Sequence, residues 1–126
     1  MSEHDTQAAF FKWASLQHID GIELLHAIPN GGERHPAVAA KLKAEGVKAG
    51  VPDVYWPVAR GAFVGLAIEF KHGNNNPTKE QSDRIERMLR NGWCVTVCRD
   101  WEAAVRFLKG YAGMLQIVLT DGGCGE

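Results

Sequence analysis

An apolar run that continues into alternating apolar and charged positions predicts a β-strand at residues 65–71. The segment reads Gly-Leu-Ala-Ile-Glu-Phe-Lys. Because successive side chains of a strand point to opposite faces, Glu69 and Lys71 would share one face. Ile68 and Phe70 would share the other face, which suits apolar packing. The strand therefore places a carboxylate and an ammonium group side by side, an arrangement that an ordinary solvent-facing ion pair would also give.

Residues 52–56 predict a second, shorter strand. Their sequence, Pro-Asp-Val-Tyr-Trp, contains the β-branched and aromatic residues that strands favour. Asp53 would then lie on a strand that neighbours the strand of Glu69. Two acids and Lys71, held on rigid strands, suit a hard divalent cation and an activated water beside it. A simpler role for Asp53 stays open, because an aspartate that follows proline also suits the cap of a turn.

Capping residues and periodic apolar positions predict helices around these strands. Ser2 with Asp5, and Thr78 with Gln81, have the three-residue spacing of a capping box. The helices are expected at residues 3–17, at 36–45, at 79–90 and from residue 101, after Asp100. Further strands are expected at residues 22–28 and 93–98. The resulting order, α-β-α-β-β-α-β-α, indicates a mixed α/β domain.

The composition fits one compact domain. The chain has 126 residues, 45% of them hydrophobic, which is enough for a core. We assign residues 1–121 to the domain and residues 122–126 to a glycine-rich tail. No apolar run approaches the roughly 20 residues that span a bilayer, and the N-terminus lacks the basic start and apolar stretch of a signal peptide. The cysteine spacing is poor for zinc or a disulfide, so we expect reduced thiols in a cytoplasmic protein.

The formal net charge of −1 does not indicate a nucleic-acid-binding protein. Any attraction to phosphates must therefore be local. Residues 33–48 contain four basic and two acidic residues, just before the segment that carries Asp53. The candidate DNA-binding residues are Arg34, Lys41, Lys43 and Lys48. A solvated helix face would explain the same charges.

Several motifs in order resemble the PD-(D/E)xK nuclease superfamily. They are Gly-Val-Pro-Asp at residues 50–53, Glu-Phe-Lys at residues 69–71 and Gln81 on the next helix. Other segments resemble one of its families, VRR-NUC, the virus-type replication-repair nucleases: Glu3 and Gln7, residues 28–32, residues 43–50, and Gly65-Leu66. The resemblance extends from about Glu3 to Tyr111.

This resemblance implies a restriction-endonuclease-like PD-(D/E)xK core, a central mixed sheet flanked by helices. It implies that Asp53 and Glu69 are ligands of Mg²⁺ or Mn²⁺, with the backbone carbonyl of Phe70 as a third ligand. Lys71 would orient or deprotonate the attacking water and neutralise charge on the phosphate. Glu3 would contribute a further carboxylate, although an acid in a first helical turn also suits the helix dipole.

Gln81 has two interpretations that do not exclude each other. The resemblance implies that it holds Lys71 or a water beside the site. A glutamine at the third helical position is also what a capping box uses. Gln81 begins the inward stripe of its helix, which favours a place near the site.

The expected function is a metal-dependent endonuclease acting on structured or branched DNA, such as a four-way junction. The resemblance to short stand-alone phage and bacterial members implies a homodimer, in the cytoplasm of a bacterial or phage-infected cell. Alternatives are a non-catalytic DNA-binding module of the same fold, or a nuclease for simple duplex DNA or RNA. The apolar residues 114–119 would either pair with those of a second copy or fold back onto the same domain.

Overall fold

The structure, a computed structural model, describes residues 1–29 and 35–115. Within these ranges a mixed four-stranded sheet has the order β1-β2-β3-β4. Its strands are β1 (His26–Ala27), β2 (Val54–Trp56), β3 (Gly65–Phe70) and β4 (Trp93–Cys98). β2 is antiparallel to β1 and β3, whereas β4 is parallel to β3. The mixed sheet with flanking helices confirms the predicted α/β class.

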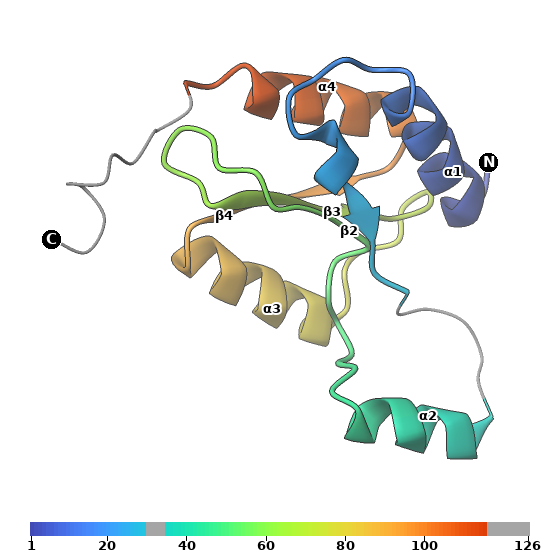
Figure 1. The fold of residues 1–126 in the computed structure, drawn as a ribbon. Coiled ribbons are helices and arrows are strands. Elements are labelled where there is room, and N and C mark those ends of the chain that lie inside the picture. The colour runs from blue at the N-terminus through green and yellow to red at the C-terminus, as the bar shows by residue number, and fades with distance from the viewer. Residues whose placement is uncertain (30–34, 116–126) are drawn as a thin grey trace, which may run out of the picture.

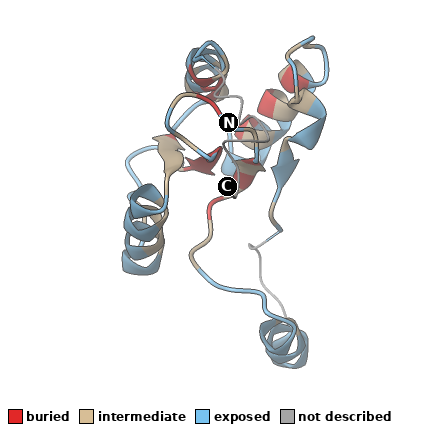
Figure 2. Cartoon of the chain, turned by 60° about the vertical axis from the view of Figure 1, so that its left-hand side comes forward, coloured by how far each residue is buried: buried red, intermediate tan, exposed pale blue. Residues whose placement is uncertain are grey.

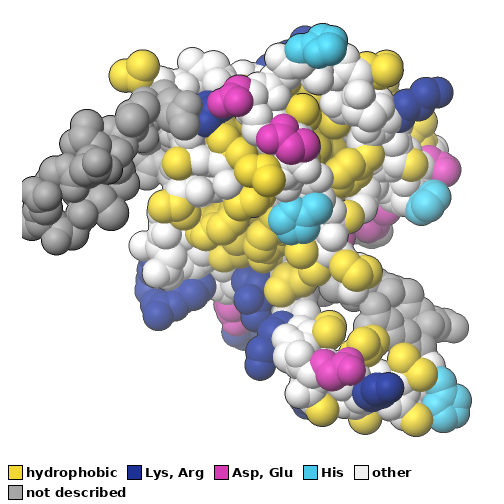
Figure 3. Space-filling view, in the orientation of Figure 1, with side chains coloured by type: hydrophobic (Ala, Val, Ile, Leu, Met, Phe, Trp, Pro, Cys, Tyr) yellow, Lys and Arg dark blue, Asp and Glu magenta, His cyan; other side chains and the backbone are white. Residues whose placement is uncertain are grey.

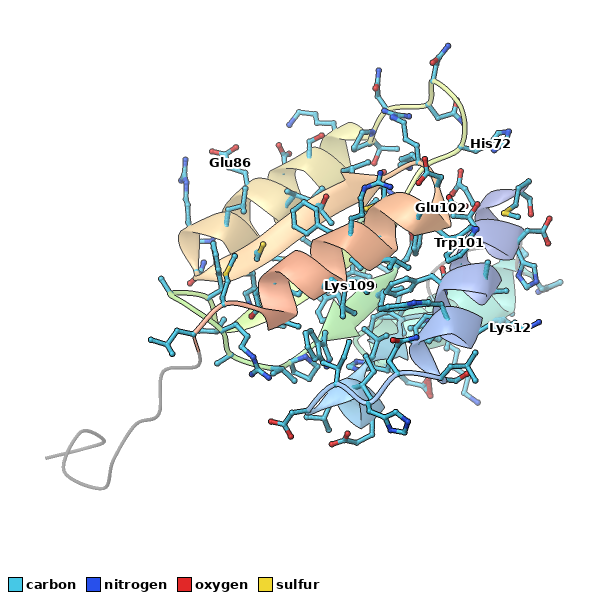
Figure 4. All side chains as sticks on the ribbon, turned by 90° about the horizontal axis from the view of Figure 1, so that it is seen from above. Lys12, His72, Glu86, Trp101, Glu102 and Lys109 are labelled. Carbon is cyan, nitrogen blue, oxygen red and sulfur yellow. The ribbon has the colours of Figure 1, made fainter. Side chains whose placement is uncertain are left out.

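Helices cover both faces of the sheet (Figure 1). α1 (Glu3–Ala14) and α4 (Trp101–Ala112) lie on one face, and α3 (Lys79–Arg90), which connects the parallel strands β3 and β4, lies on the other. Seen from above, α1 and α4 run side by side (Figure 4). Among the described residues, no helix is both long and apolar enough to cross a membrane.

The main core fills the layer between the sheet and the pair α1 and α4. The side chains that it buries completely or almost completely include Phe10, Val54, Trp56, Leu66, Ile68, Phe70, Leu108 and Tyr111. The polar atoms of its aromatic residues have partners: Trp56 Nε1 donates to the Gly21 carbonyl at 2.8 Å, and the Tyr111 hydroxyl donates to the Val58 carbonyl at 2.6 Å. A buried Trp or Tyr needs such partners, because an unpaired polar atom would destabilise the core.

β3 is buried on both faces. All six of its residues are buried, and Glu69 is only 3% exposed. Leu66, Ile68 and Phe70 belong to the core with α1 and α4, whereas Glu69 contacts Gln81 of α3. The structure therefore rules out the simple solvent-facing ion pair at Glu69.

The strand expected at residues 22–28 is wrong for most of its length. A 3₁₀ turn, η1 (Ile22–Leu24), occupies its first half, and only the two residues of β1 are extended. Gly21 precedes the turn with φ of 83°, a conformation that favours glycine. Ile22 and Leu25, three residues apart, both pack against the core. The apolar positions thus follow the spacing of a turn and not the alternation of a strand.

The other element boundaries differ from expectation by a few residues at most. α1 ends at Ala14, because Ser15 and Gln17 donate side-chain hydrogen bonds to carbonyls of its last turn. α2 (Pro36–Ala44) ends one residue early, and α3 and β4 have the expected bounds. Both predicted capping boxes, Ser2 with Asp5 and Thr78 with Gln81, are present.

α2 stands apart from the rest of the domain (Figure 1). None of its residues is buried, and Figure 2 shows it exposed at a distance from the buried interior. The imidazole of His35 caps it, since Nδ1 accepts from the amide of Ala37 at 3.1 Å. The predicted tail and residues 116–119 of the apolar segment lie outside the described residues. The described start of that segment folds back, since the carbonyl of Leu115 accepts from the amide of Gly61 at 2.8 Å.

Two glycines offer a matched test of this packing. A Cβ at Gly65 would lie 2.5 Å from the Trp93 ring, which must then move, whereas a Cβ at Gly110 in α4 meets nothing within 4 Å. Gly65→Ala should therefore lower the free energy of unfolding by about 1–3 kcal/mol. Gly110→Ala should raise it by roughly 0.5–1 kcal/mol, because alanine favours a helix. Urea unfolding measures both, and a Gly65→Ala variant as stable as wild type would contradict the packing of Trp93 over β3.

Candidate active site

Two acids meet where β2 and β3 lie side by side. Asp53 directly precedes β2, and the pairing of Val54 with Ile68 brings Asp53 next to Glu69. One Asp53 carboxylate oxygen, Oδ2, accepts from the backbone amide of Phe70 at 2.8 Å. That hydrogen bond fixes the Asp53 side chain against the end of β3. The turn-cap interpretation of Asp53 is therefore less apt than a role between the two strands.

Glu69 receives partners on one oxygen and none on the other. Its Oε2 accepts from Gln81 Nε2 at 2.9 Å and lies 3.4 Å from Lys71 Nζ. Its Oε1 is buried and has no hydrogen-bond partner within the described part of the chain. A buried carboxylate oxygen without a donor is costly. Such an oxygen is where a cation would bind.

Burial raises the pKa values of both acids, and the charge of Asp53 raises the pKa of Glu69 further. Burial is the largest cause for Glu69, the charge of Asp53 adds to it, and together they outweigh Lys71 and raise the pKa of Glu69 from 4.5 to about 7. Burial also raises the pKa of Asp53, although the amide of Phe70 opposes this change. Two carboxylates in a low-dielectric site cannot easily both be charged unless a positive charge joins them.

The donor set fits a hard divalent cation. The paired carboxylates and the unpartnered Oε1 of Glu69 offer oxygen ligands, which Mg²⁺ and Mn²⁺ prefer. Within residues 1–29 and 35–115, no group of three or more His, Cys, Asp or Glu side chains forms a metal cluster. A cation here would use the two carboxylates with backbone or water oxygens, as Mg²⁺ sites often do. The Phe70 carbonyl as a third ligand stays a prediction.

Lys71 and Gln81 both approach Oε2 of Glu69, from two different parts of the fold. Lys71 follows β3, and its backbone amide donates to the Cys98 carbonyl of β4 at 3.0 Å. Gln81 lies in the first turn of α3. Its Oε1 accepts from the amide of Thr78 at 2.9 Å while its Nε2 donates to Glu69. The capping interpretation and the site interpretation of Gln81 therefore hold at once, through the two ends of one amide.

Glu3 lies at the margin of this group. It occupies the first turn of α1, is exposed, and its charge contributes to the raised pKa of Asp53. It does not complete a three-carboxylate cluster with Asp53 and Glu69 in the described structure. Its contribution to metal binding stays a prediction.

The candidate DNA-binding residues lie outside this buried group. Lys41 and Lys43 are exposed on α2, and Lys48 is exposed in the segment that leads from α2 to β2. Arg34 lies outside the described residues. The connecting segment approaches α3 closely, because a Cβ at Gly50 would lie 3.0 Å from the backbone of Glu80. α2 is therefore tied to the first turn of the helix that carries Gln81.

One residue near the site was missed by the sequence analysis. Arg99 follows β4 and donates from Nη1 to the carbonyls of Gly73 and Asn75, at 2.7 and 2.6 Å. Its Nη2 donates to Asn76 Oδ1 at 3.3 Å. All three acceptors lie in the loop that joins Lys71 to Gln81. The position of Arg99 in the sequence, between a strand and a helix cap, did not indicate a role near the site, because an arginine there is common in any α/β chain.

The fold is similar to that of a solved structure from a known family. A comparison with models of protein families found no match, and a comparison with curated proteins found none either. Among solved structures, the chain is similar to one described as a VRR_NUC domain protein, with 29% sequence identity and a TM-score of 0.82. The match covers 100% of this chain and 97% of that chain. This match supports a VRR-NUC family assignment. It is consistent with a restriction-endonuclease-like fold and supports a nuclease-family domain.

The raised pKa values of Asp53 and Glu69 predict a pH-dependent stability. In chelator, Glu69 should lower the free energy of unfolding as the pH rises from about 4.5 to about 7. Folded Glu69 keeps its proton in this range while the unfolded chain releases it, so the loss of protons favours unfolding. Asp53 should add a loss of the same sign, because its pKa is also raised.

Urea unfolding at several pH values, with Glu69→Gln beside wild type, measures this contribution. The stability of the variant relative to wild type should increase across the range. Glu86→Gln, on the exposed face of α3, is the control and should follow wild type (Figure 4). A constant difference between Glu69→Gln and wild type would contradict the raised pKa.

Proposed function

We propose that the protein is a divalent-metal-dependent endonuclease that hydrolyses phosphodiester bonds of structured or branched DNA. The observation that carries the proposal is the buried Glu69 with the half-buried Asp53 next to it, a pair that has an unpartnered oxygen and a lysine beside it. A purely structural ion pair would not need a second acid. The VRR-NUC fold supports the same chemistry.

Each residue of the site has a distinct part in this proposal. Asp53 and Glu69 would hold Mg²⁺ or Mn²⁺, which lowers the pKa of a coordinated water and offsets phosphate charge. Lys71, whose ammonium group is only partly exposed, would orient the attacking water and stabilise charge that develops on the phosphate. Gln81 would keep Glu69 Oε2 in place, so that Oε1 stays directed at the cation.

DNA would be held by basic side chains at some distance from the buried site. In the orientation of Figure 3, Lys and Arg side chains gather along the lower edge of the molecule, over α3, and others lie on α2. We propose that Lys41, Lys43 and Lys48 contact phosphates, together with Arg34. Such contacts are independent of base sequence, which fits recognition of DNA by its shape.

The site argues against one of two rival functions. A non-catalytic DNA-binding module of the same fold would have no use for two neighbouring acids with raised pKa values, so the intact Asp53, Glu69 and Lys71 argue against it. A nuclease for RNA or simple duplex DNA would need the same residues. Only the substrate distinguishes that rival from the proposal.

The decisive experiment is cleavage of a panel of labelled four-way junctions, flaps, duplexes and RNA, in Mg²⁺, Mn²⁺ or chelator. We expect metal-dependent cleavage that favours branched DNA. Asp53→Asn and Glu69→Gln should abolish it and leave the fold intact, because each substitution removes one of two mutually repelling charges. Lys71→Ala should lower kcat far more than DNA affinity. Glu86→Gln, an exposed acid outside the site, is the matched control and should cleave as wild type does.

Three outcomes would contradict parts of this proposal. Cleavage that persists in chelator would show that the reaction does not depend on a divalent metal. Full cleavage by Asp53→Asn or Glu69→Gln, with purity checked, would show that the site lies elsewhere. A protein that binds DNA and cleaves nothing in the panel would favour the non-catalytic module.

We further propose that the working unit is a homodimer. One site cuts one strand, and symmetric cleavage of a four-way junction needs two sites related by a two-fold axis. Exposed apolar side chains are available for such an interface. Val38 on α2 is 49% exposed, and Leu115 after α4 is 85% exposed. The described start of the segment after α4 already forms a hydrogen bond with Gly61 of its own chain. This contact disfavours a dimer that pairs through that segment.

Light scattering at micromolar concentration tests the oligomeric state, and the positions of nicks on a labelled junction test the geometry. We expect twice the mass of the chain and paired nicks on opposite arms. Val38→Glu should shift the mass towards the monomer if α2 forms the contact, whereas Val47→Glu, in the segment after α2, is the comparison. A monomer that nicks a single strand would contradict the dimer and leave structure-dependent nicking.

A further inference from the structure

The loop of residues 72–78 decides where two functional side chains stand relative to each other. Lys71 comes before it, and Gln81 lies in the helical turn that follows it. Lys71 Nζ and Gln81 Nε2 both approach Glu69 Oε2, at 3.4 and 2.9 Å. The loop contains no helix or strand, and nearly all of it is exposed. An exposed loop without other support would sample many conformations.

Arg99 stabilises the loop through hydrogen bonds that the loop does not form by itself. Its guanidinium donates three hydrogen bonds to this loop, to the carbonyls of Gly73 and Asn75 and to the side chain of Asn76. One further hydrogen bond lies within the loop, from the amide of Asn75 to the carbonyl of His72 at 3.1 Å. Arg99 therefore organises three of the four residues that form the tip.

The backbone of Arg99 is itself fixed beside Lys71. It follows Cys98, whose carbonyl accepts from the amide of Lys71 where β3 and β4 end in parallel. At its other side, Asp100 caps α4 by accepting from the amide of Ala103 at 2.6 Å. The guanidinium thus connects the loop to the sheet and to α4, the most rigid parts of the domain.

We propose that Arg99 is a positioning residue of this site. By holding residues 73–76, it fixes the direction in which the chain leaves Lys71 and the place where Thr78 starts α3. The capping box of Thr78 then fixes the Gln81 amide against Glu69. Arg99 touches none of the reacting groups, and it acts through the loop. The inference rests on the proposed nuclease function.

A second role for Arg99 has a different signature. No carboxylate in the described part of the chain forms an ion pair with it, so its charge is available beside the site. A phosphate anchor would also use such a charge. Lysine separates the two roles, because a compact ammonium group keeps the charge but cannot span the acceptors that a planar guanidinium reaches together.

The experiment compares Arg99→Lys, Arg99→Ala and the control Arg90→Lys. Arg90 is an exposed arginine of α3 whose partner is Glu86, one turn away. Multiple-turnover cleavage at saturating DNA gives kcat, and titration gives the DNA affinity. Both Arg99 variants should lose about 10–100-fold in kcat, because a misplacement of about 1 Å has this effect. DNA affinity should change by less than about threefold, and Arg90→Lys should match wild type.

Hydrogen exchange gives a readout that does not depend on cleavage. The Asn75 amide, which is hydrogen-bonded within the loop, should exchange faster in both Arg99 variants than in wild type, while amides of β3 stay unchanged. If Arg99→Lys exchanges at the wild-type rate, the positioning role is wrong. Unchanged kcat in both variants would overturn it too. So would a phosphate-anchor pattern, in which Arg99→Lys is fully active and Arg99→Ala loses DNA affinity.

The two proposals fail in distinguishable ways. A wild-type protein that cleaves none of the nucleic acids in the panel contradicts the proposed function, and the exchange rates still decide whether Arg99 holds the loop. If the wild-type protein is active and the Arg99 variants match it in kcat and in exchange rates, only the positioning role is contradicted.

Discussion

The burial of one carboxylate next to another is the constraint on which the site depends. Glu69 is buried, and Asp53 lies half-buried beside it. Burial raises the pKa of both groups, and the charge of Asp53 raises the pKa of Glu69 further. A fold gains no stability from such a pair when it is empty, because hydrophobic residues would pack there at lower cost. The surrounding hydrogen bonds, from the Phe70 amide and the Gln81 side chain, hold the acids in place and leave one oxygen of Glu69 without a donor. The unpartnered oxygen of Glu69 is thus left in place as a ligand for the proposed cation.

The layered fold is what makes the burial possible. β3 is covered on one face by α1 and α4, where Phe10 and Phe70 have ring centroids 5.9 Å apart, and on the other face by α3. Alternation along the strand puts Ile68 into the first layer and Glu69 into the second. Because α3 presents the amide of Gln81 and not an apolar side chain at this point, Glu69 has a polar partner in an otherwise dry place. If the first turn of α3 began one residue later, the amide of Gln81 would no longer face Glu69.

The sequence predicted the strands at residues 52–56 and 65–71, both capping boxes and the meeting of Asp53 with Glu69, because each rests on local spacing. It missed what depends on tertiary packing. Alternation implied one polar face for β3, yet the chain folds a helix onto that face and buries Glu69. Residues 22–28 looked extended, but the turn after Gly21 directs Ile22 and Leu25 inward. Arg99 was invisible for the same reason, since its three acceptors lie more than twenty residues away in the chain.

α2 stands apart from the sheet, against which α1, α3 and α4 lie (Figure 1). It has nine residues, and none of them is buried. An isolated helix of this length is marginal in water, since nucleation costs more than a few backbone hydrogen bonds return. Proline at its start, the His35 cap and six alanines or lysines of high helix propensity reduce that cost without removing it. Since α2 contributes no packing to the domain, the free energy of unfolding places little constraint on its sequence. Its exposed lysines and its exposed Val38 are therefore accessible to the DNA and to the second copy proposed above, and the close approach of Gly50 to Glu80 places the segment after α2 beside the first turn of α3.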